Sequence, residues 1–159
     1  MFIGEYQHNL DEKARLALPV KFREAFAHGA VVTRGLDHCL FVYSADEWKK
    51  LADKLATLPI ATANTRAFAR LMLAGAMDCT LDKQGRVVVP EYLREYAGIQ
   101  KSVVVAGLYN RLELWDEAAW KKYKTATEEE SNSIAEALSQ LGVWSSTLPS
   151  RIGLGNVDL

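Results

Sequence analysis

The chain has 159 residues, of which 49% are hydrophobic and 25% are charged, the composition of a soluble globular protein with one domain or two small modules. No apolar run approaches the ~20 residues that a membrane span requires, and no basic leader followed by an apolar stretch opens the chain, so we expect a cytoplasmic protein without a membrane partner. The net charge of −1 and the pI of about 6.3 count against a protein that binds nucleic acid through its overall charge, although oligomerisation would multiply a small basic patch.

The first part of the chain predicts a strand, a polar turn, a strand, a short helix and a hairpin, over residues 2–10, 11–14, 15–18, 20–27, 30–34 and 39–43. Pro19 fits the first position of the short helix, where a missing N–H costs nothing. Gly29 is a candidate C-cap.

The middle of the chain predicts two helices. One covers 46–58, with Ser44 as N-cap, and the other covers 64–74. The same series of short strands and a short helix then returns, over residues 86–89, 91–97, 102–106 and 111–115, with Gly98 as helix C-cap. Residues 116–141 predict a further helix, and residues 145–159 read as a tail.

A nine-residue pattern occurs twice, 71 positions apart: Asp11-Glu-Lys-Ala-Arg15-Leu-Ala-Leu-Pro19 and Asp82-Lys-Gln-Gly-Arg86-Val-Val-Val-Pro90. Each copy has an acid four residues before an arginine, then three apolar residues and a proline. A repeat of this kind indicates one structural unit used twice. Since the match extends from Gly4 and Gly75 to Trp48 and Trp120, we predict the following organisation: module 1 at 4–48, a helical linker at 49–74, module 2 at 75–120, and a C-terminal helix and tail at 121–159.

This duplicated strand–turn–strand with Asp-x-x-x-Arg, an apolar triplet, proline and a short helix resembles the AbrB-type DNA-binding fold. Two copies in one chain of this length, with Met1-Phe2-x-Gly4 and Leu112-Glu-Leu-Trp115-Asp116, resemble the MraZ family of bacterial transcriptional regulators. The resemblance implies an α+β fold in which tandem AbrB-like modules form a pseudo-twofold, swapped-hairpin β-barrel flanked by short helices.

The resemblance also implies function. It implies a ring-shaped homo-oligomer in the cytoplasm, associated with the nucleoid. The expected partner is double-stranded DNA, at short repeats in the promoter of the protein's own operon of cell-division and cell-wall genes. No catalysis, cofactor or small-molecule substrate is expected.

Two basic residues flank each turn and are the candidate DNA contacts: Lys13, Arg15, Lys83 and Arg86. The planar fork of an arginine can hold phosphate oxygens or the two acceptors on the major-groove edge of guanine. Asp11 and Asp82 would be poor phosphate contacts, and we predict that they orient the turn and its arginine. Glu12 adds a negative charge beside the first candidate contact.

The alternative for each Asp–Arg pair is a structural ion pair that pins a hairpin turn. Duplication does not remove this alternative, because two folded modules would both need the pin; the family resemblance is what favours DNA binding. Arg23 and Arg94 lie at matching places on the two short helices, and we interpret them as solvated helix faces.

Other classes of function have less support. His8, His28 and the His38-Cys39 pair lack the spacing of structural zinc sites, and Cys39 and Cys79 are expected to be buried or idle thiols. The tryptophans are expected to be core or interface anchors: Trp48, Trp115, Trp120 and Trp144. An enzyme using Asp11 and Asp82 as a carboxylate pair has no nucleophile elbow or phosphate loop beside it. The remaining alternative is a structural assembly protein whose repeated edge binds protein.

Overall fold

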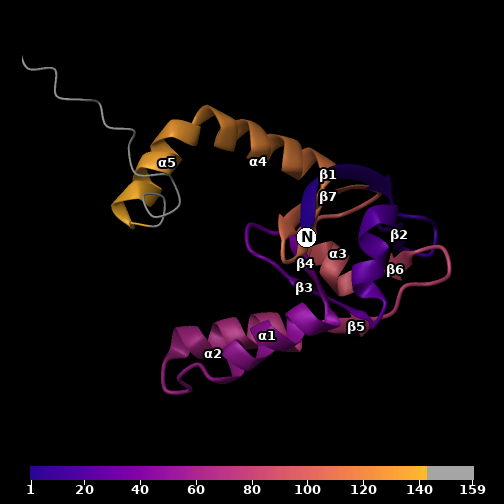
Figure 1. Ribbon diagram of the computed structural model, residues 1–159, viewed down its shortest axis with the longest axis horizontal. Coiled ribbons are helices and arrows are strands. Elements are labelled where there is room, and N and C mark those ends of the chain that lie inside the picture. The colour runs from indigo at the N-terminus through magenta and orange to yellow at the C-terminus, as the bar shows by residue number, and fades with distance from the viewer. Residues whose placement is uncertain (143–159) are drawn as a thin grey trace, which may run out of the picture. The chain divides into compact units, whose positions relative to one another are not determined.

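Residues 1–142 are described by the computed structural model, so Trp144 and the predicted tail lie outside the described residues. The elements in chain order are β1 (Phe2–Asn9), β2 (Arg15–Ala17), the 3-10 helix η1 (Val20–Phe26), β3 (Ala30–Arg34), β4 (Leu40–Ser44), α1 (Ala45–Ala56), α2 (Ala63–Ala69), the π-helix η2 (Arg70–Ala74), β5 (Met77–Cys79), β6 (Arg86–Val88), α3 (Glu91–Ala97), β7 (Ser102–Tyr109), β8 (Leu112–Asp116), α4 (Glu117–Glu129) and α5 (Ser131–Gln140) (Figure 1). The predicted α+β class is confirmed.

The strands form a six-stranded antiparallel sheet in the order β1-β7-β8-β4-β3-β5 and a separate two-stranded ladder of β2 and β6. The order is symmetric about the β8–β4 pair, and the first strand of each half pairs with a strand of the other half, β1 with β7 and β5 with β3. Within residues 1–142 the strands are assigned to these two sheets and not to one closed barrel, so the swapped-hairpin barrel stays a prediction.

Strict alternation along the central strands gives the sheet two buried faces. In β4, Leu40 and Val42 join the main core between the sheet and the β2–β6 ladder, while Phe41 and Tyr43 point to the opposite face. Residues of β2, η1, β6 and α3 complete the main core. The second core lies under α1 and includes Leu55.

The tryptophans of the described residues occupy this second core, as predicted. Trp115 is buried, its ring lies 5.4 Å from that of Trp120, and Trp48 lies 5.9 Å from the ring of Tyr43. Because Trp48 and Trp120 lie in the first turns of the helices that follow the two hairpins, these aromatic contacts fix the helix starts against the sheet.

Helix boundaries agree with several capping signals and differ at others. Ser44 is the N-cap of α1 and accepts a hydrogen bond from the Glu47 N–H at 3.3 Å, as predicted. Gly98 caps α3 with φ of +64°, again as predicted. The C-cap of η1 is Ala27 instead of Gly29, and Pro19 is its N-cap, one position before the predicted place. Pro90 is likewise the N-cap of α3.

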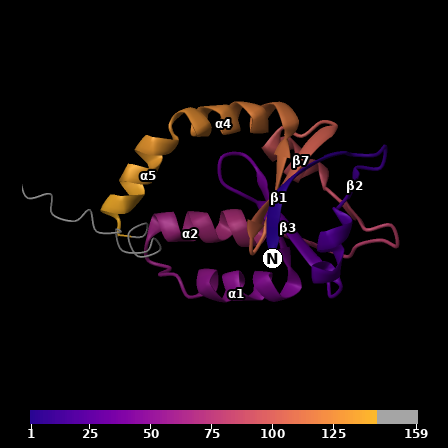
Figure 2. The same ribbon diagram turned by 45° about the horizontal axis from the view of Figure 1, so that its top comes forward.

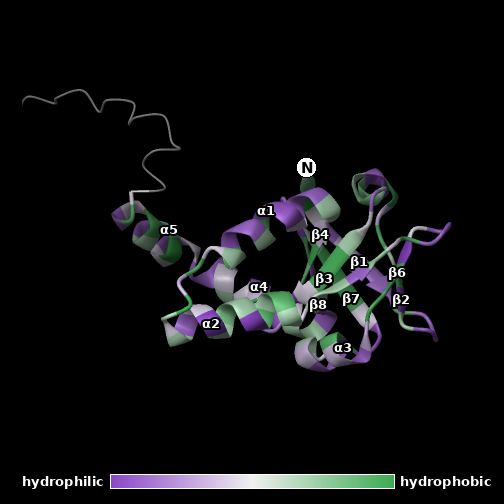
Figure 3. Cartoon of the chain, turned by 90° about the horizontal axis from the view of Figure 1, so that it is seen from below, coloured by the Kyte–Doolittle hydropathy of each residue, from purple (hydrophilic) through white to green (hydrophobic). Residues whose placement is uncertain are grey.

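The two halves are unequal at their first strands. β1 has eight residues, whereas β5 has three, because the helical segment α2–η2 continues to Ala74. α1 and α2 lie side by side in both views (Figures 1 and 2). The hydrophilic turns before β2 and β6 extend from the end of the sheet opposite this helical hairpin (Figure 3).

The chain divides into two units, one of residues 1–120 and one that begins at Lys121. The second unit holds most of α4 and all of α5. The single helix predicted over 116–141 is therefore wrong in one respect, because α4 ends at Glu129 and α5 begins at Ser131, with Glu130 between them. In the described part of the chain, no helix has the length and apolarity that crossing a bilayer would require. The modules at 4–48 and 75–120 and the linker at 49–74 stay predictions.

Candidate nucleic-acid interface

The β2–β6 ladder brings the two copies of the repeated pattern together. Arg15 pairs with Val88, Leu16 with Val87, and Ala17 with Arg86. Alternation turns one set of side chains into the main core, where each is at most 1% exposed: Leu16, Leu18, Val87 and Val89. The other set, which includes both arginines, therefore faces outward from the same side of the ladder.

The first turn is organised around the carboxylate of Asp11. Its Oδ1 accepts hydrogen bonds from the backbone N–H groups of Lys13 and Arg15, each at 2.9 Å. Its Oδ2 accepts from Arg15 Nε at 2.6 Å. Ala14 completes the turn with φ of +56°, a conformation that costs a residue with a Cβ about 1 kcal/mol.

The second turn repeats this geometry. Oδ1 of Asp82 accepts from the N–H groups of Gln84 and Arg86 at 2.9 Å each, and Oδ2 accepts from Arg86 Nε at 2.7 Å. Gly85 takes the place of Ala14, with φ of +74°. Each carbonyl at this position accepts a hydrogen bond across the ladder, Gly85 from Leu18 and Ala14 from Val89, so each turn is tied to the strand of the other copy.

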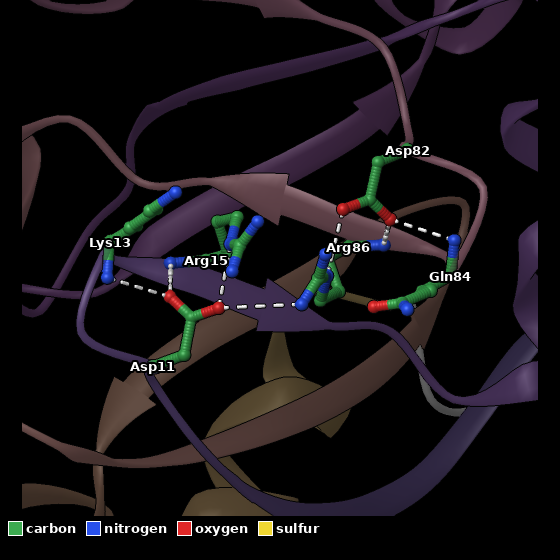
Figure 4. A network of polar contacts seen from close by, with 6 residues as sticks. All are labelled: Asp11, Lys13, Arg15, Asp82, Gln84 and Arg86. Atoms are coloured by element: carbon green, nitrogen blue, oxygen red, sulfur yellow. Dashed lines mark hydrogen bonds and ion pairs between the residues drawn. The ribbon is translucent and has the colours of Figure 1, made fainter.

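One ion pair joins the two turns. Arg86 Nη1 lies 3.6 Å from Oδ2 of Asp11, the oxygen that also accepts from Arg15 (Figure 4). Figure 4 shows both guanidinium groups between the two aspartates. The side chains of Arg15 and Arg86 keep 29% and 25% of their surface exposed, so neither arginine is sealed beneath its neighbours.

The hydrogen bonds lower the pKa of both aspartates. For Asp11 the largest cause is the backbone N–H of Arg15, followed among the favourable causes by the Arg15 side chain. For Asp82 the corresponding donors are the backbone and then the side chain of Arg86. Both carboxylates are therefore ionised near neutral pH and hold their arginines by charge-assisted bonds.

The predicted lysines lie on the exposed parts of the two turns, Lys13 before Arg15 and Lys83 directly after Asp82. Neither lysine forms an ion pair within residues 1–142. The structure thus puts Arg15 and Arg86 on one ladder, and the other four predicted site residues lie in the two turns that lead into it. Glu12, in the first turn, is exposed as well.

The interpretation of Arg23 and Arg94 as solvated helix faces is wrong. Both are half-buried, and each donates from Nε to the last carbonyl before its proline, Arg23 to Leu18 at 2.9 Å and Arg94 to Val89 at 3.0 Å. These carbonyls end the ladder, so the arginines tie each short helix to the site. The matched positions of Arg23 and Arg94 in the two copies indicated a shared role for these arginines. The spacing does not show that their side chains reach back to the end of the ladder.

The other candidate sites considered from the sequence are a metal site and the two thiols. Among residues 1–142, no cluster of histidine, cysteine, aspartate or glutamate has the geometry to hold a metal ion. Cys39 is buried and Cys79 is half-buried, and burial raises the pKa of both thiols, as expected of unreactive cysteines.

The sequence is similar to proteins of one family. The family model MraZ, described as "MraZ protein, putative antitoxin-like", matches residues 1–71 and again 72–141. Three proteins named "Transcriptional regulator MraZ" are similar over 143 residues, which is 90% of this chain and 100% of each relative. The identity is 51% for the protein of Halothermothrix orenii, 48% for that of Desulfitobacterium hafniense strain DSM 10664 and 46% for that of Caldanaerobacter subterraneus subsp. tengcongensis.

Proposed function

Because the chain belongs to the MraZ family, we propose that it is a sequence-specific DNA-binding transcriptional regulator that acts in the cytoplasm on the nucleoid, without catalysis or cofactor. Its proposed targets are short repeats in the promoter of its own division and cell-wall operon. The proposed contacts are Lys13, Arg15, Lys83 and Arg86, with Asp11 and Asp82 as the residues that orient the turns.

The observation that carries the proposal is the pair of arginines on the outer face of the ladder. Each uses Nε to bind its aspartate, which leaves both terminal amino groups of Arg15 and the Nη2 group of Arg86 for a ligand, because Nη1 of Arg86 lies 3.6 Å from Asp11 Oδ2. Holding the guanidinium in place before binding lowers the entropy cost of the contact. The Nη atoms of such a fork match the two acceptors of guanine or two phosphate oxygens.

The two arginines are not equivalent in this arrangement. Arg15 has one carboxylate within ion-pair distance, whereas Arg86 has two, Asp82 and Asp11. A carboxylate beside a guanidinium competes with an anionic ligand, so we propose that Arg15 contributes more to DNA affinity than Arg86.

The ladder and turns of a single chain offer four proposed cationic contacts, and phosphate contacts of this kind are weak and salt-sensitive. Linking several sites raises avidity by roughly 10²–10⁴ when the geometry allows them to bind together. We therefore propose that a ring-shaped homo-oligomer, built from swapped-hairpin barrels, presents several ladders to repeated DNA boxes.

The test is a titration of a fluorescent fragment of the upstream promoter region with the full chain at several salt concentrations. We expect Arg15→Ala to lower affinity about 5–150-fold, the range of about 1–3 kcal/mol for one arginine–guanine contact, and Arg86→Ala to lower it less. The matched control is Lys54→Ala, which removes an exposed positive charge from α1, on the helical hairpin far from the ladder (Figure 1).

If Arg15 and Arg86 have only a structural role, the titration gives a different result. If both arginine variants fold and bind the promoter as the parent does, the arginine assignment is wrong even though DNA binding stands. Absence of salt-dependent binding by the parent would instead favour the second candidate, an assembly protein whose repeated edge binds protein. The observation that supports this second candidate is Val88, which is 52% exposed on the same outer face as the arginines.

A further inference from the structure

A groove of about 460 Å³ lies beside the second turn, between the end of η1 and the segment that leads from β5 into β6. Its lining includes three basic residues, Arg23, His28 and Lys83. Asp82 is the only carboxylate of this lining, and its oxygens already accept from two turn N–H groups and from the side chain of Arg86. The groove thus presents cations whose charge is not cancelled inside it.

Arg23, which lines this groove, is held in place by two contacts. Its Nε donates to the Leu18 carbonyl at 2.9 Å, and its side chain lies over Gly85 so closely that a Cβ there would overlap it. The terminal amino groups remain for a ligand. The charge of Arg23 also reaches His8, whose pKa is lowered first by burial and second by this arginine.

The corresponding edge of the first turn has a different charge. The repeat puts Arg94 in the place of Arg23, with the equivalent bond to Val89. However, Glu12 stands where the second copy has Lys83, and Ile99 and Gln100 follow the helix where the first copy has His28. The first turn and its helix therefore carry two carboxylates, Asp11 and Glu12, against the two cations Lys13 and Arg94, whereas the second turn and its helix carry one carboxylate, Asp82, against the two cations Lys83 and Arg23.

We propose that the groove beside the second turn binds one phosphodiester of the DNA backbone through Lys83, His28 and the terminal amino groups of Arg23, and that the matching edge of the first turn does not. The proposal rests on the proposed DNA-binding function. Lysine and histidine supply N–H donors, and release of counterions favours each cation placed against a phosphate. A duplex lying on the outer face of the ladder would carry its backbone past this groove, because the turn that holds Arg86 forms one of its walls.

The experiment measures promoter binding of the full chain by fluorescence anisotropy as a function of salt concentration. Lys83→Gln should weaken binding about 3–10-fold and reduce the slope of log affinity against log salt by about one, the signature of one lost phosphate contact. His28→Asn should weaken binding about 2–10-fold, the range for one hydrogen bond. Glu12→Lys should steepen the slope by about one, because it puts a cation at the position equivalent to Lys83.

Two variants serve as matched controls. Lys54→Gln makes the same charge change as Lys83→Gln on α1, and His38→Asn makes the same change as His28→Asn at an exposed turn, where φ is +57° and asparagine is tolerated. Both should bind as the parent does. Arg23→Ala is not used for this purpose, since it would also break the bond to Leu18.

The outcomes separate the two proposals. If the parent binds the promoter but Lys83→Gln and His28→Asn keep its affinity and salt slope, the groove assignment is overturned and the proposed function stands. If the parent shows no salt-dependent binding, the proposed function fails and the groove assignment fails with it. Equal loss in the variants and in their controls would show a general charge effect and would also overturn the groove assignment.

Discussion

Gly85 allows a direct test of how the second turn is held. Its φ is +74°, and a Cβ added to it would lie 2.5 Å from Cζ of Arg23 and closer still to Nε and Cδ. Gly85→Ala therefore has two costs: a backbone conformation that L residues rarely adopt, and displacement of the arginine from the Leu18 carbonyl. Gly98 is the matched control, because its φ is +64° and nothing lies within 4 Å of the position its Cβ would take.

The magnitudes follow from these two contributions. Gly98→Ala should lower the free energy of unfolding by about 1 kcal/mol, the cost of the left-handed conformation alone. Gly85→Ala should cost about 2–3 kcal/mol, because a half-buried hydrogen bond worth about 1 kcal/mol is lost and its carbonyl is left without a donor. For a chain of this size, 1 kcal/mol corresponds to a shift of about 2–4 °C in Tm, so the shifts should be about 2–4 °C and about 5–10 °C.

The assay is thermal unfolding followed by circular dichroism at one protein concentration, because association makes Tm concentration-dependent. Combining Gly85→Ala with Arg23→Ala completes a double-mutant cycle. In that background Gly85→Ala should cost no more than Gly98→Ala does in the parent, since no arginine remains to be displaced. If Gly85→Ala and Gly98→Ala cost the same in the parent, or if the extra cost persists without Arg23, the account of this contact is refuted.

Further predictions concern the carboxylates, the thiols and the core. Because folding lowers the pKa of Asp11 from its ordinary value of 3.8, the ionised carboxylate stabilises the fold at pH values above 3.8. This contribution is lost as the pH falls through the lower pKa of the folded state. Asp11→Asn should therefore flatten the fall of Tm between pH 5 and pH 3, more than Asp82→Asn does, because only Asp11 pairs with arginines of both turns; equal effects would contradict the shared pairing. Cys39 and Cys79 should react slowly with a thiol reagent in the native state and rapidly in denaturant, and rapid native reaction would contradict their burial. Leu16→Ala should lower the free energy of unfolding by about 2–5 kcal/mol in denaturant titrations, since the side chain is 0% exposed; a loss below 1 kcal/mol would place it outside the core.

Local features of the fold were predictable because their causes are local. The strand predicted over 39–43, the Ser44 cap and the Gly98 cap depend on neighbouring residues, and the structure confirms all three. The break at Glu130 was missed because no glycine or proline marks it, and the helix resumes after a single residue. The helix predicted over 64–74 agrees with α2 and η2, whereas the three-residue strand β5 that follows was not predicted, because so short a segment shows little alternation.

Contacts between the two copies were not predictable in the same way. The pattern shows that Asp11 and Asp82 occupy equivalent positions, but not that β2 and β6 pair with Leu16 opposite Val87. Such pairing depends on burial of both strands in one core, which spacing within a copy does not report. The fold-back of Arg23 onto the second turn is of the same kind, because it joins residues of different copies.

Pairing of the two copies also changes the choice between a structural and a binding role for the Asp–Arg pairs. A turn that needed only an ion pair would be satisfied by its own aspartate, as Asp82 satisfies Arg86. Yet Arg86 also reaches Asp11, and both arginines stay a quarter or more exposed on one face. The two aspartates thus hold two guanidinium groups side by side on this face, where one anionic ligand lying across the ladder could contact both. Under the proposed function, the structural pin and the binding surface are therefore one arrangement, in which the carboxylates fix the guanidinium groups and leave both terminal nitrogens of Arg15 and Nη2 of Arg86 to the ligand.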